Sequence, residues 1–250
     1  MNEELSALVY AGALIFARLG AILMLMPGIG EPGVPPRARL AFALMFSLAL
    51  APFIAPELPA EPVQPLAMAA MLMSEALIGL MIGAVMRMFM SVASVAGQIV
   101  GQQTGLAMAQ AFDPSQGQSG ALMSTFLNLL FIVLIFVTNL HHLLLLAARG
   151  SYDVMPVGSL PPLADTAEWA LTIFSDSFRI GIQIAAPLIV FGLVFYFGLG
   201  VLSRLMPQAQ IFFIAMPVNI LAGFFIFAIS VGAMAMVWLQ RLESFAVEFQ

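Results

Sequence analysis

Long apolar segments alternate with short polar ones along this chain. The apolar segments cover residues 5–26, 38–55, 66–112, 121–148, 169–203 and 209–239. An α-helix needs about 20 apolar residues, within a range of about 17 to 25, to cross the hydrocarbon core of a bilayer. The pattern therefore predicts an all-α integral membrane protein with six or seven hydrophobic helical segments.

The segment at residues 66–112 is long and contains no proline. As one helix it would extend roughly 70 Å, more than twice the thickness of the hydrocarbon core. It therefore either folds back near residues 87–94 or forms a long helix that leaves the bilayer.

Prolines and glycines interrupt the other segments. Residues 27–36 contain four prolines and three glycines, and such a composition cannot stay helical. Pro187 predicts a break in one apolar segment, and Pro217 predicts a kink in another. Polar loops are predicted at residues 56–65, 149–168 and 206–208, of which the second is the longest. We therefore expect kinked or broken helices that form hairpins.

The few charged residues predict an orientation. Glu3 and Glu4 precede the first apolar segment, whereas Arg37 and Arg39 follow it. Because basic residues favour cytoplasmic loops, the N-terminus is expected outside the cytoplasm and the first loop inside it. The acidic start also differs from the basic start of a signal peptide, so we expect the first segment to be a retained span.

Composition supports the membrane assignment and excludes several functions. Of the 250 residues, 62% are hydrophobic and 8% are charged, whereas a soluble domain is about half apolar and about a quarter charged. No polar stretch exceeds roughly twenty residues, so a single membrane domain is expected over residues 1–250. The chain has no cysteine, which excludes disulfides and thiolate chemistry, and its net charge of −5 is spread too thinly to favour nucleic acid.

A polar stretch at residues 97–120 lies between two apolar segments. Its first glycines recur every four residues, which places them on one helix ridge where a second backbone can approach closely. The adjacent glutamines can hydrogen-bond between helices. The candidates for such helix packing are Gly79, Gly83, Gly97, Gln98, Gly101 and Gln102. For the first two, ordinary packing within the chain explains the spacing equally well.

Three charged residues at predicted membrane depth, Arg18, Glu75 and Arg87, are candidates for function. Glu75 and Arg87 are twelve positions apart, about 120° around a straight helix, so they do not share one face. Their partners are therefore expected on other helices or other subunits, and purely structural pairing is the simpler explanation. His141 and His142, near the end of a span, are expected to be structural rather than metal ligands.

No catalytic motif accompanies these residues. The sequence contains no HExxH, P-loop or nucleophile elbow. We therefore predict no catalytic residue, no metal site and no cofactor, and do not expect an enzyme. A small secondary transporter is the main alternative, because broken helices and intramembrane charges are typical of that class, although two similar halves are not evident. An intramembrane enzyme using His141 or Glu75 is a weaker alternative.

A series of motifs runs along nearly the whole chain. The earlier ones are Arg18-Leu-Gly20 before Pro27, Pro35-Pro36-Arg37-Ala-Arg39, Glu75 with Gly79 and Gly83, and Gly97 to Gly105 before Asp113-Pro114 and Gly117. The later ones are His141-His142, Ser151-Tyr152, Met155-Pro156-Val157-Gly158, Ala186-Pro187, Arg204 to Gln208 before Phe212, then Pro217 and Gly223. In order and spacing they resemble the FliR family of flagellar export-gate proteins, whose injectisome counterpart is the SctT type. Gln210 departs from the pattern, where asparagine is expected.

The resemblance implies a role in protein transport. FliR-like proteins join FliP-like and FliQ-like subunits in a helical hetero-oligomer that forms the entry pore of type III secretion, and an FlhB-like protein wraps its cytoplasmic mouth. Unfolded flagellar subunits pass through this pore across the bacterial inner membrane, within the flagellar basal body. The assembled complex lies largely above the bilayer plane, which would account for the length of residues 66–112.

The resemblance also implies a plug loop at about residues 105–120 that helps to close the pore. Its candidate residues are Gly105, Met108, Gln110, Phe112, Asp113, Pro114, Gln116, Gly117 and Gly120. Met108 and Phe112 are suited to dry sealing, the glycines to hinges, and the glutamines to hydrogen bonds with a passing backbone. A cytoplasmic or subunit-facing bend is expected at Arg204, Pro207 and Gln208.

Overall fold

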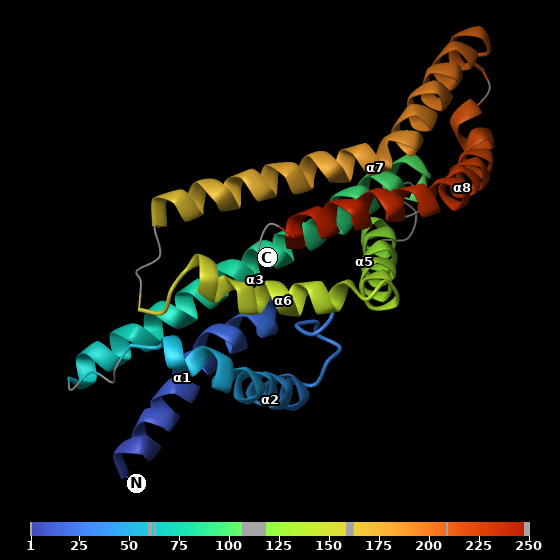
Figure 1. Cartoon of the computed structure of the whole chain (residues 1–250). Helices are drawn as coiled ribbons and strands as arrows, with labels where there is room; N and C mark the ends of the chain where they lie inside the picture. Colours follow the sequence, from blue (N-terminus) through green and yellow to red (C-terminus); the bar gives the residue numbers. More distant parts are fainter. Residues whose placement is uncertain are drawn as a thin grey trace. The chain divides into compact units, whose positions relative to one another are not determined.

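The computed structural model describes residues 2–59, 62, 64–106, 119–158, 163–208 and 210–247 (Figure 1). Its α-helices are α1 (Asn2–Leu25), α2 (Pro36–Ile54), α3 (Pro65–Gln103), α5 (Ser119–Val137), α6 (Leu140–Val154), α7 (Leu163–Leu205) and α8 (Ile211–Val247), with a short 3₁₀ helix η1 (Ala55–Glu57) after α2. No strand occurs within these ranges, so the predicted all-α class is confirmed.

Five of the described helices, α1, α2, α3, α7 and α8, are long and apolar enough to cross a membrane. The pair α5 and α6 meets the same criterion only as a bent pair, Leu122–Val137 with Leu140–Val154, which raises the number of spans to six. The chain is therefore an integral membrane protein, and six spans match the lower predicted number.

Helix α3 is uninterrupted over its 39 residues, so the alternative of a fold-back near residues 87–94 is wrong. At about 1.5 Å per residue it is about 58 Å long, well beyond the thickness of a hydrocarbon core. It ends at Gln103, earlier than the predicted end at Phe112, and a turn follows at residues 104 and 105.

The sequence predicted one apolar segment at residues 121–148, but the structure divides it into two helices. Helix α5 ends at Val137 and α6 begins at Leu140, with Asn139 between them in the left-handed conformation (φ 59°). Asparagine tolerates this conformation better than most residues with a side chain. A single polar residue therefore accounts for a break that neither proline nor glycine marks.

The long polar loop predicted at residues 149–168 is mostly helical, and that prediction is wrong. Helix α6 continues to Val154, and α7 already begins at Leu163. Ser151 and Tyr152 lie in the last turns of α6 and are buried. The Ser151 hydroxyl donates to the Ala148 carbonyl within α6, and the Tyr152 hydroxyl donates to Ile15 of α1, so these polar side chains do not mark a loop.

Two helices carry a proline in their interior. Helix α7 has 43 residues and contains Pro187, and α8 has 37 residues and contains Pro217. A proline removes one N–H group from the helix ladder and bends the helix. Both helices change direction along their length in Figure 1, but neither ends at its proline. The prediction that Pro187 breaks its segment is therefore wrong, because Pro187 lies inside a continuous, bent helix.

The chain divides into two compact units, and α3, α5, α7 and α8 contribute to both. The first unit comprises Met1–Phe89, Ile135–Phe174 and Glu243–Gln250, and the second comprises Met90–Leu134 and Ser175–Leu242. A single domain over residues 1–250 stays a prediction.

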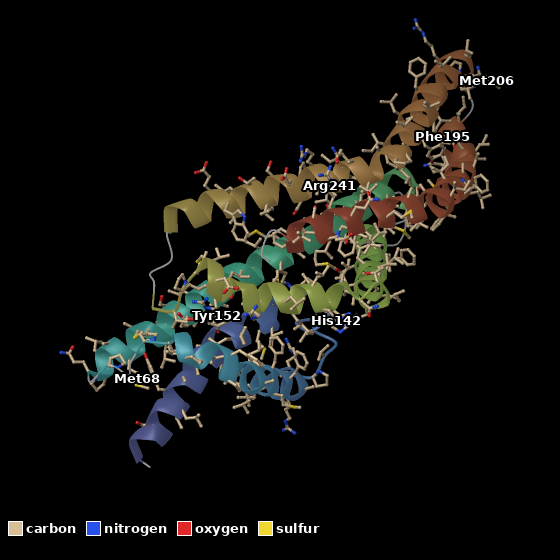
Figure 2. All side chains as sticks on the ribbon, viewed as in Figure 1. Met68, His142, Tyr152, Phe195, Met206 and Arg241 are labelled. Atoms are coloured by element: carbon tan, nitrogen blue, oxygen red, sulfur yellow. The ribbon has the colours of Figure 1, made fainter. Side chains whose placement is uncertain are left out.

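The core of the first unit lies along α1, which packs on α2 and α6. The fully buried side chains of this helix include Leu14, Ile15, Leu19, Ile22 and Leu23. Phe245 stacks with Phe89 at a centroid distance of 5.5 Å, and with Trp169 at 6.4 Å. Tyr152 of α6 also belongs to this unit (Figure 2).

The core of the second unit contains aromatic pairs between α5 and α8. Phe131 and Trp238 are fully buried and stack with centroids 4.1 Å apart. Phe126 meets Phe227 edge to face at 5.9 Å. The turn between α7 and α8 carries the exposed side chain of Met206 (Figure 2). These pairs hold α5 against α8, in the unit that contains the end of α3.

Candidate functional site

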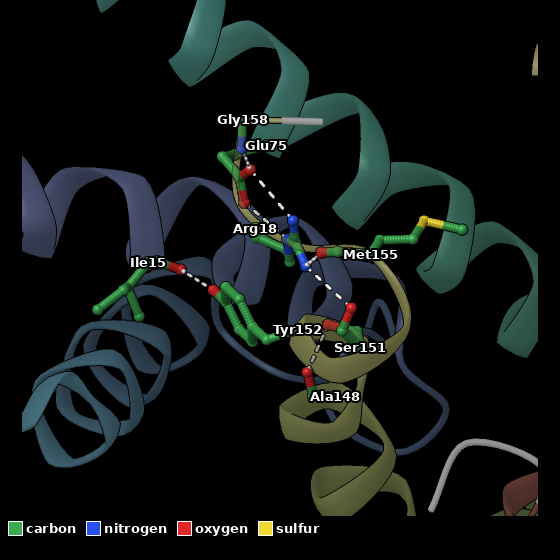
Figure 3. Close-up of polar contacts among 8 residues, drawn as sticks. All are labelled: Ile15, Arg18, Glu75, Ala148, Ser151, Tyr152, Met155 and Gly158. Carbon is green, nitrogen blue, oxygen red and sulfur yellow. Dashed lines mark hydrogen bonds and ion pairs between the residues drawn. The ribbon is translucent and has the colours of Figure 1, made fainter. Parts of the chain in front are cut away.

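A buried ion pair joins α1 to α3 in the first unit (Figure 3). The Arg18 guanidinium donates from Nε to Oε2 of Glu75 at 2.7 Å and from Nη2 to Oε1 at 3.1 Å. Both side chains have no exposed surface. Two parallel N–H···O bonds give the strong, directional geometry of arginine with a carboxylate.

Backbone groups at the end of α6 complete the coordination of this pair. Arg18 Nη1 donates to the carbonyl oxygens of Ser151 at 3.0 Å and Met155 at 2.7 Å. The Gly158 N–H donates to Glu75 Oε1 at 3.2 Å. The Ser151 carbonyl also accepts from the Met155 N–H at 3.0 Å, and a cation is favourable at the C-terminal end of a helix. The pair therefore fastens the end of α6 and the following turn to α1 and α3.

Tyr152 covers the guanidinium from one side. The Arg18 Cζ atom lies 4.2 Å from the centre of the Tyr152 ring, which is a cation–π geometry. The Tyr152 hydroxyl donates a long bond of 3.4 Å to the carbonyl of Ile15 (Figure 3). The charged groups of Arg18 and Glu75 are thus paired and hydrogen-bonded, as burial at membrane depth requires.

Arg87, the third predicted charge, does not join this cluster. Its Nη1 lies 3.8 Å from Oε1 of Glu31 in the α1–α2 loop, and its side chain is 44% exposed. Such an exposed pair contributes little to stability. The structure therefore brings together two of the three charges and places the third at a surface.

Gly79 and Gly83 lie where α3 crosses α1. A Cβ atom on Gly79 would overlap the carbonyl oxygen of Arg18 and lie 2.8 Å from Ala21 Cβ. A Cβ on Gly83 would lie 2.9 Å from Leu25 Cβ. The two small residues thus allow α1 to approach closely enough for Arg18 to reach Glu75, a contact within the chain.

Gly97 has the same role in the second unit, where α3 meets α5. A Cβ atom on Gly97 would overlap the backbone of Ser124, whose hydroxyl donates to the Ser94 carbonyl at 3.1 Å. Gly101 is buried farther along α3, whereas Gln98 and Gln102 are exposed. The glycine ridge thus packs inside the chain, and the two glutamines face outward.

The end of α3 forms a fixed root for the polar stretch that follows. Thr104 is fully buried, and its hydroxyl donates to the Val100 carbonyl at 2.8 Å. Gly105 has φ +75°, a conformation that strongly favours glycine, and its N–H donates to the Gln102 carbonyl at 3.2 Å. The chain therefore leaves α3 in a direction that Gly105 determines. We call residues Thr104 and Gly105 the loop root.

Helix α8 packs on the loop root and α7 packs on the neighbouring Gln103, each through a pair of residues spaced by four positions. On α8, a Cβ on Gly223 would lie 2.8 Å from Thr104 Cα, and Asn219 Nδ2 lies 2.7 Å from the Cβ position of Gly105. On α7, a Cβ on Gly192 would overlap the Gln103 side chain, and the Tyr196 hydroxyl accepts a 3.3 Å hydrogen bond from Asn219 Nδ2. These pairs seat the end of α3 against both helices.

The remaining predicted residues have varied positions. Met108, Gln110, Phe112, Asp113, Pro114, Gln116 and Gly117 lie outside the described residues. Gly120 lies in the first turn of α5 rather than in a loop, which corrects its predicted position. Arg204, Pro207 and Gln208 lie at the exposed end of α7 and the turn after it.

The histidine pair lies at the start of α6 (His142 is labelled in Figure 2). The His141 ring is 4.0 Å from His142 and 5.1 Å from Phe136. Within the described part of the chain, no three His, Cys, Asp or Glu side chains are grouped so as to hold a metal ion.

Sequence reasoning did not identify several residues of these clusters as functional candidates. Tyr152 and Gly158 belonged to the family motifs, but their contacts with Arg18 and Glu75 span more than 80 positions. Thr104 lay within the motif from Gly97 to Gly105 without being singled out, and Tyr196, Gly192 and Asn219 carried no motif signal. The four-residue spacings of Gly192 with Tyr196 and of Asn219 with Gly223 could have indicated shared helix faces.

The fold and the buried clusters define an all-α membrane protein in which internal ion pairing and glycine contacts fix several long helices. Residues 9–245 match the family model of the bacterial export proteins, family 1. The chain thus belongs to this family, which confirms the resemblance drawn from its motifs.

Named relatives agree with the family match. The chain is 42% identical over 233 residues to the flagellar biosynthetic protein FliR of Caulobacter vibrioides, covering 93% of each protein. It is 32% identical over 209 residues to the FliR protein of Escherichia coli, covering 82% of this chain and 78% of the relative. It is 28% identical over 222 residues to the surface presentation of antigens protein SpaR of Salmonella typhimurium, covering 86% and 81%.

Proposed function

We propose that this chain is the gate-forming subunit of flagellar type III protein export, and that the segment from Gly105 toward residue 118 is its plug. By its family, the chain is a component of the flagellar type III export apparatus. Identity to the FliR of Caulobacter vibrioides is 42%, against 28% for SpaR, which favours flagellar use.

The observation that carries the gate proposal is the anchored loop root. Thr104 and Gly105 are buried against α8, and the preceding Gln103 lies against Gly192 of α7, so packing and the positive φ of Gly105 determine how the chain leaves α3. The segment beyond it contains Met108 and Phe112 among glycines and glutamines. A plug must seal against ions yet yield to an unfolded polypeptide, and apolar side chains in a sequence rich in glycine and glutamine suit both demands.

The proposal includes partners and a location. The chain would assemble with FliP-like and FliQ-like subunits in one hetero-oligomer, with an FlhB-like protein at its cytoplasmic mouth, in the inner membrane of the flagellar basal body. Unfolded flagellar subunits would pass through it, and the chain itself would catalyse no reaction. The exposed Gln98 and Gln102 on α3 support an assembly, because amides at membrane depth favour hydrogen bonds with neighbouring helices.

Deletion of residues 110–118 tests the plug. We expect the complex to assemble with its usual partners and the membrane to conduct ions at rest, because the seal is missing. The measurements are copurification of the other gate subunits and resting conductance of the purified complex in planar bilayers. Unchanged conductance with normal assembly would rule out a plug in this segment.

Purification separates the gate from the alternative of a solute transporter. A gate subunit should copurify with other membrane proteins at unequal copy number. A transporter should instead be stable and active as an isolated chain. Solute transport by the purified chain alone would therefore overturn the gate proposal.

A further inference from the structure

We propose that Asn219 is a positioning residue for the gate, which acts through its carboxamide and the Tyr196 hydroxyl on the loop root. This inference rests on the proposed gate function and concerns how the closed state is held. It assigns a role to two residues on α7 and α8 that do not belong to the plug segment.

The contact between Asn219 and Gly105 leaves no free space. The Cβ position of Gly105 lies 2.7 Å from Asn219 Nδ2 and 3.6 Å from Asn219 Cγ. Because Gly105 has φ +75°, a side chain there would be strained as well as obstructed. The Asn219 carboxamide thus lies directly against the residue that sets the exit direction of the chain.

The hydrogen bonding of Asn219 is incomplete. Its side chain is 4% exposed, and Nδ2 donates to the Tyr196 hydroxyl at 3.3 Å. Within the described residues, Oδ1 is buried without a hydrogen-bond partner. If the carboxamide were turned over, Tyr196 could donate to the oxygen, and the NH₂ group would lack a partner instead. In either orientation one polar end of Asn219 is buried and unpaired.

A buried, unpaired polar group costs stability, and native structures contain few of them. Leucine has a similar size and would remove this cost at position 219. An asparagine that is less favourable for stability than leucine is typical of a residue with a functional constraint. Here the Asn219 carboxamide donates a hydrogen bond to Tyr196 of α7 and also packs against Gly105. It therefore couples the loop root to both α7 and α8.

The decisive variant is Asn219→Leu, measured in the assembled complex for both thermal stability and resting ion conductance. We expect a melting temperature equal to or above that of the wild type, because the unpaired polar group is gone. We also expect resting conductance to rise about fivefold. Loss of one hydrogen bond would increase the fraction of open gates by about this factor. A purely structural asparagine would change stability and leave conductance unchanged, which would overturn the proposal.

Tyr196→Phe is the second variant and depends less on folding, because the Tyr196 side chain is 40% exposed. It removes the hydrogen-bond partner of Asn219 and keeps the ring, so we expect a rise in conductance in the same direction. Matched controls are Tyr10→Phe in the first unit and Asn128→Leu, a half-buried asparagine on α5. Equal conductance in Tyr196→Phe and in the wild type would contradict the role of the hydroxyl.

A double variant tests whether Asn219 acts on Gly105 itself. Gly105→Ala alone should raise conductance, because the new Cβ meets the carboxamide. If the two residues act through one contact, Gly105→Ala with Asn219→Leu should leak no more than the leakier single variant. Multiplied effects would mean independent action and would overturn the assignment.

The deletion of residues 110–118 separates this inference from the proposed function. If the deletion raises resting conductance and the Asn219 and Tyr196 variants do not, the result supports the plug and contradicts the positioning role of Asn219. If the deletion itself does not leak, the gate proposal falls, and this inference falls with it.

Discussion

Arg18 on α1 and Glu75 on α3 are 57 positions apart in the sequence and form a fully buried ion pair, with Nε and Oε2 2.7 Å apart. The carbonyls of Ser151 and Met155 and the N–H of Gly158 supply further hydrogen bonds. Removing two charges from water costs several kcal/mol, so such a pair persists only with this degree of compensation. The pair therefore defines how α1, α3 and the end of α6 are joined.

Replacement of one partner of this pair should destabilise the protein strongly. Arg18→Met leaves the Glu75 carboxylate buried and unpaired, and we expect a loss of about 3–5 kcal/mol in the free energy of unfolding. The double variant Arg18→Met with Glu75→Leu should recover most of that loss, because no charge remains buried. Reversible unfolding in detergent, followed by circular dichroism, measures both. A double variant as unstable as the single one would show that the charges themselves are required.

The face of the Tyr152 ring, rather than its hydroxyl, should carry the contribution of this residue. Tyr152→Phe keeps the ring 4.2 Å from Arg18 Cζ and loses only a 3.4 Å hydrogen bond. We expect a loss below about 1 kcal/mol for this change and about 2 kcal/mol for Tyr152→Leu, which removes a desolvated cation–π contact. The same unfolding experiment compares the two, and equal losses would contradict the cation–π assignment.

The packing glycines should differ from glycines that face open space. Gly97→Ala places a methyl group into the backbone of Ser124, and we expect a loss of about 1–3 kcal/mol from overpacking. The control is Gly232→Ala on α8, where nothing lies within 4 Å of the new atom. There a gain of up to about 1 kcal/mol is expected from helix propensity. Similar stabilities for both variants would argue against close packing at Gly97.

A charge within the proposed plug should disturb closure without preventing assembly. Gly117→Asp adds a carboxylate and a Cβ where the proposal requires a flexible hinge, so resting conductance of the complex should increase. Gly33→Asp is the control, because Gly33 lies in the α1–α2 loop with nothing within 4 Å of its Cβ position. The measurement is planar-bilayer conductance together with copurification of partners. Conductance that stays at the wild-type level in both variants would count against a hinge at residue 117.

The pattern of apolar and polar residues was sufficient to predict those features that depend on contact with the bilayer. Apolar length and low charge predicted the membrane class, the all-α fold and most helix starts, because each depends on neighbouring residues alone. The order of motifs was sufficient for the family. The pattern failed at Ser151 and Tyr152, which look like loop residues and lie in α6. Their polar groups meet partners from α1, and no local rule selects those partners.

By itself, therefore, the sequence determined that this chain is a helical membrane protein of an export family with a polar segment after residue 97. Only the tertiary structure decided which charges pair. Glu75 pairs with Arg18 of α1 and not with Arg87 of its own helix, because Gly79 lets α1 approach α3 closely, whereas Arg87 lies near Glu31. The tertiary structure also decided where the helical part of the polar segment ends. Gly105 adopts a positive φ beside Asn219, which is 114 positions away in the sequence, and sequence spacing cannot specify such a contact.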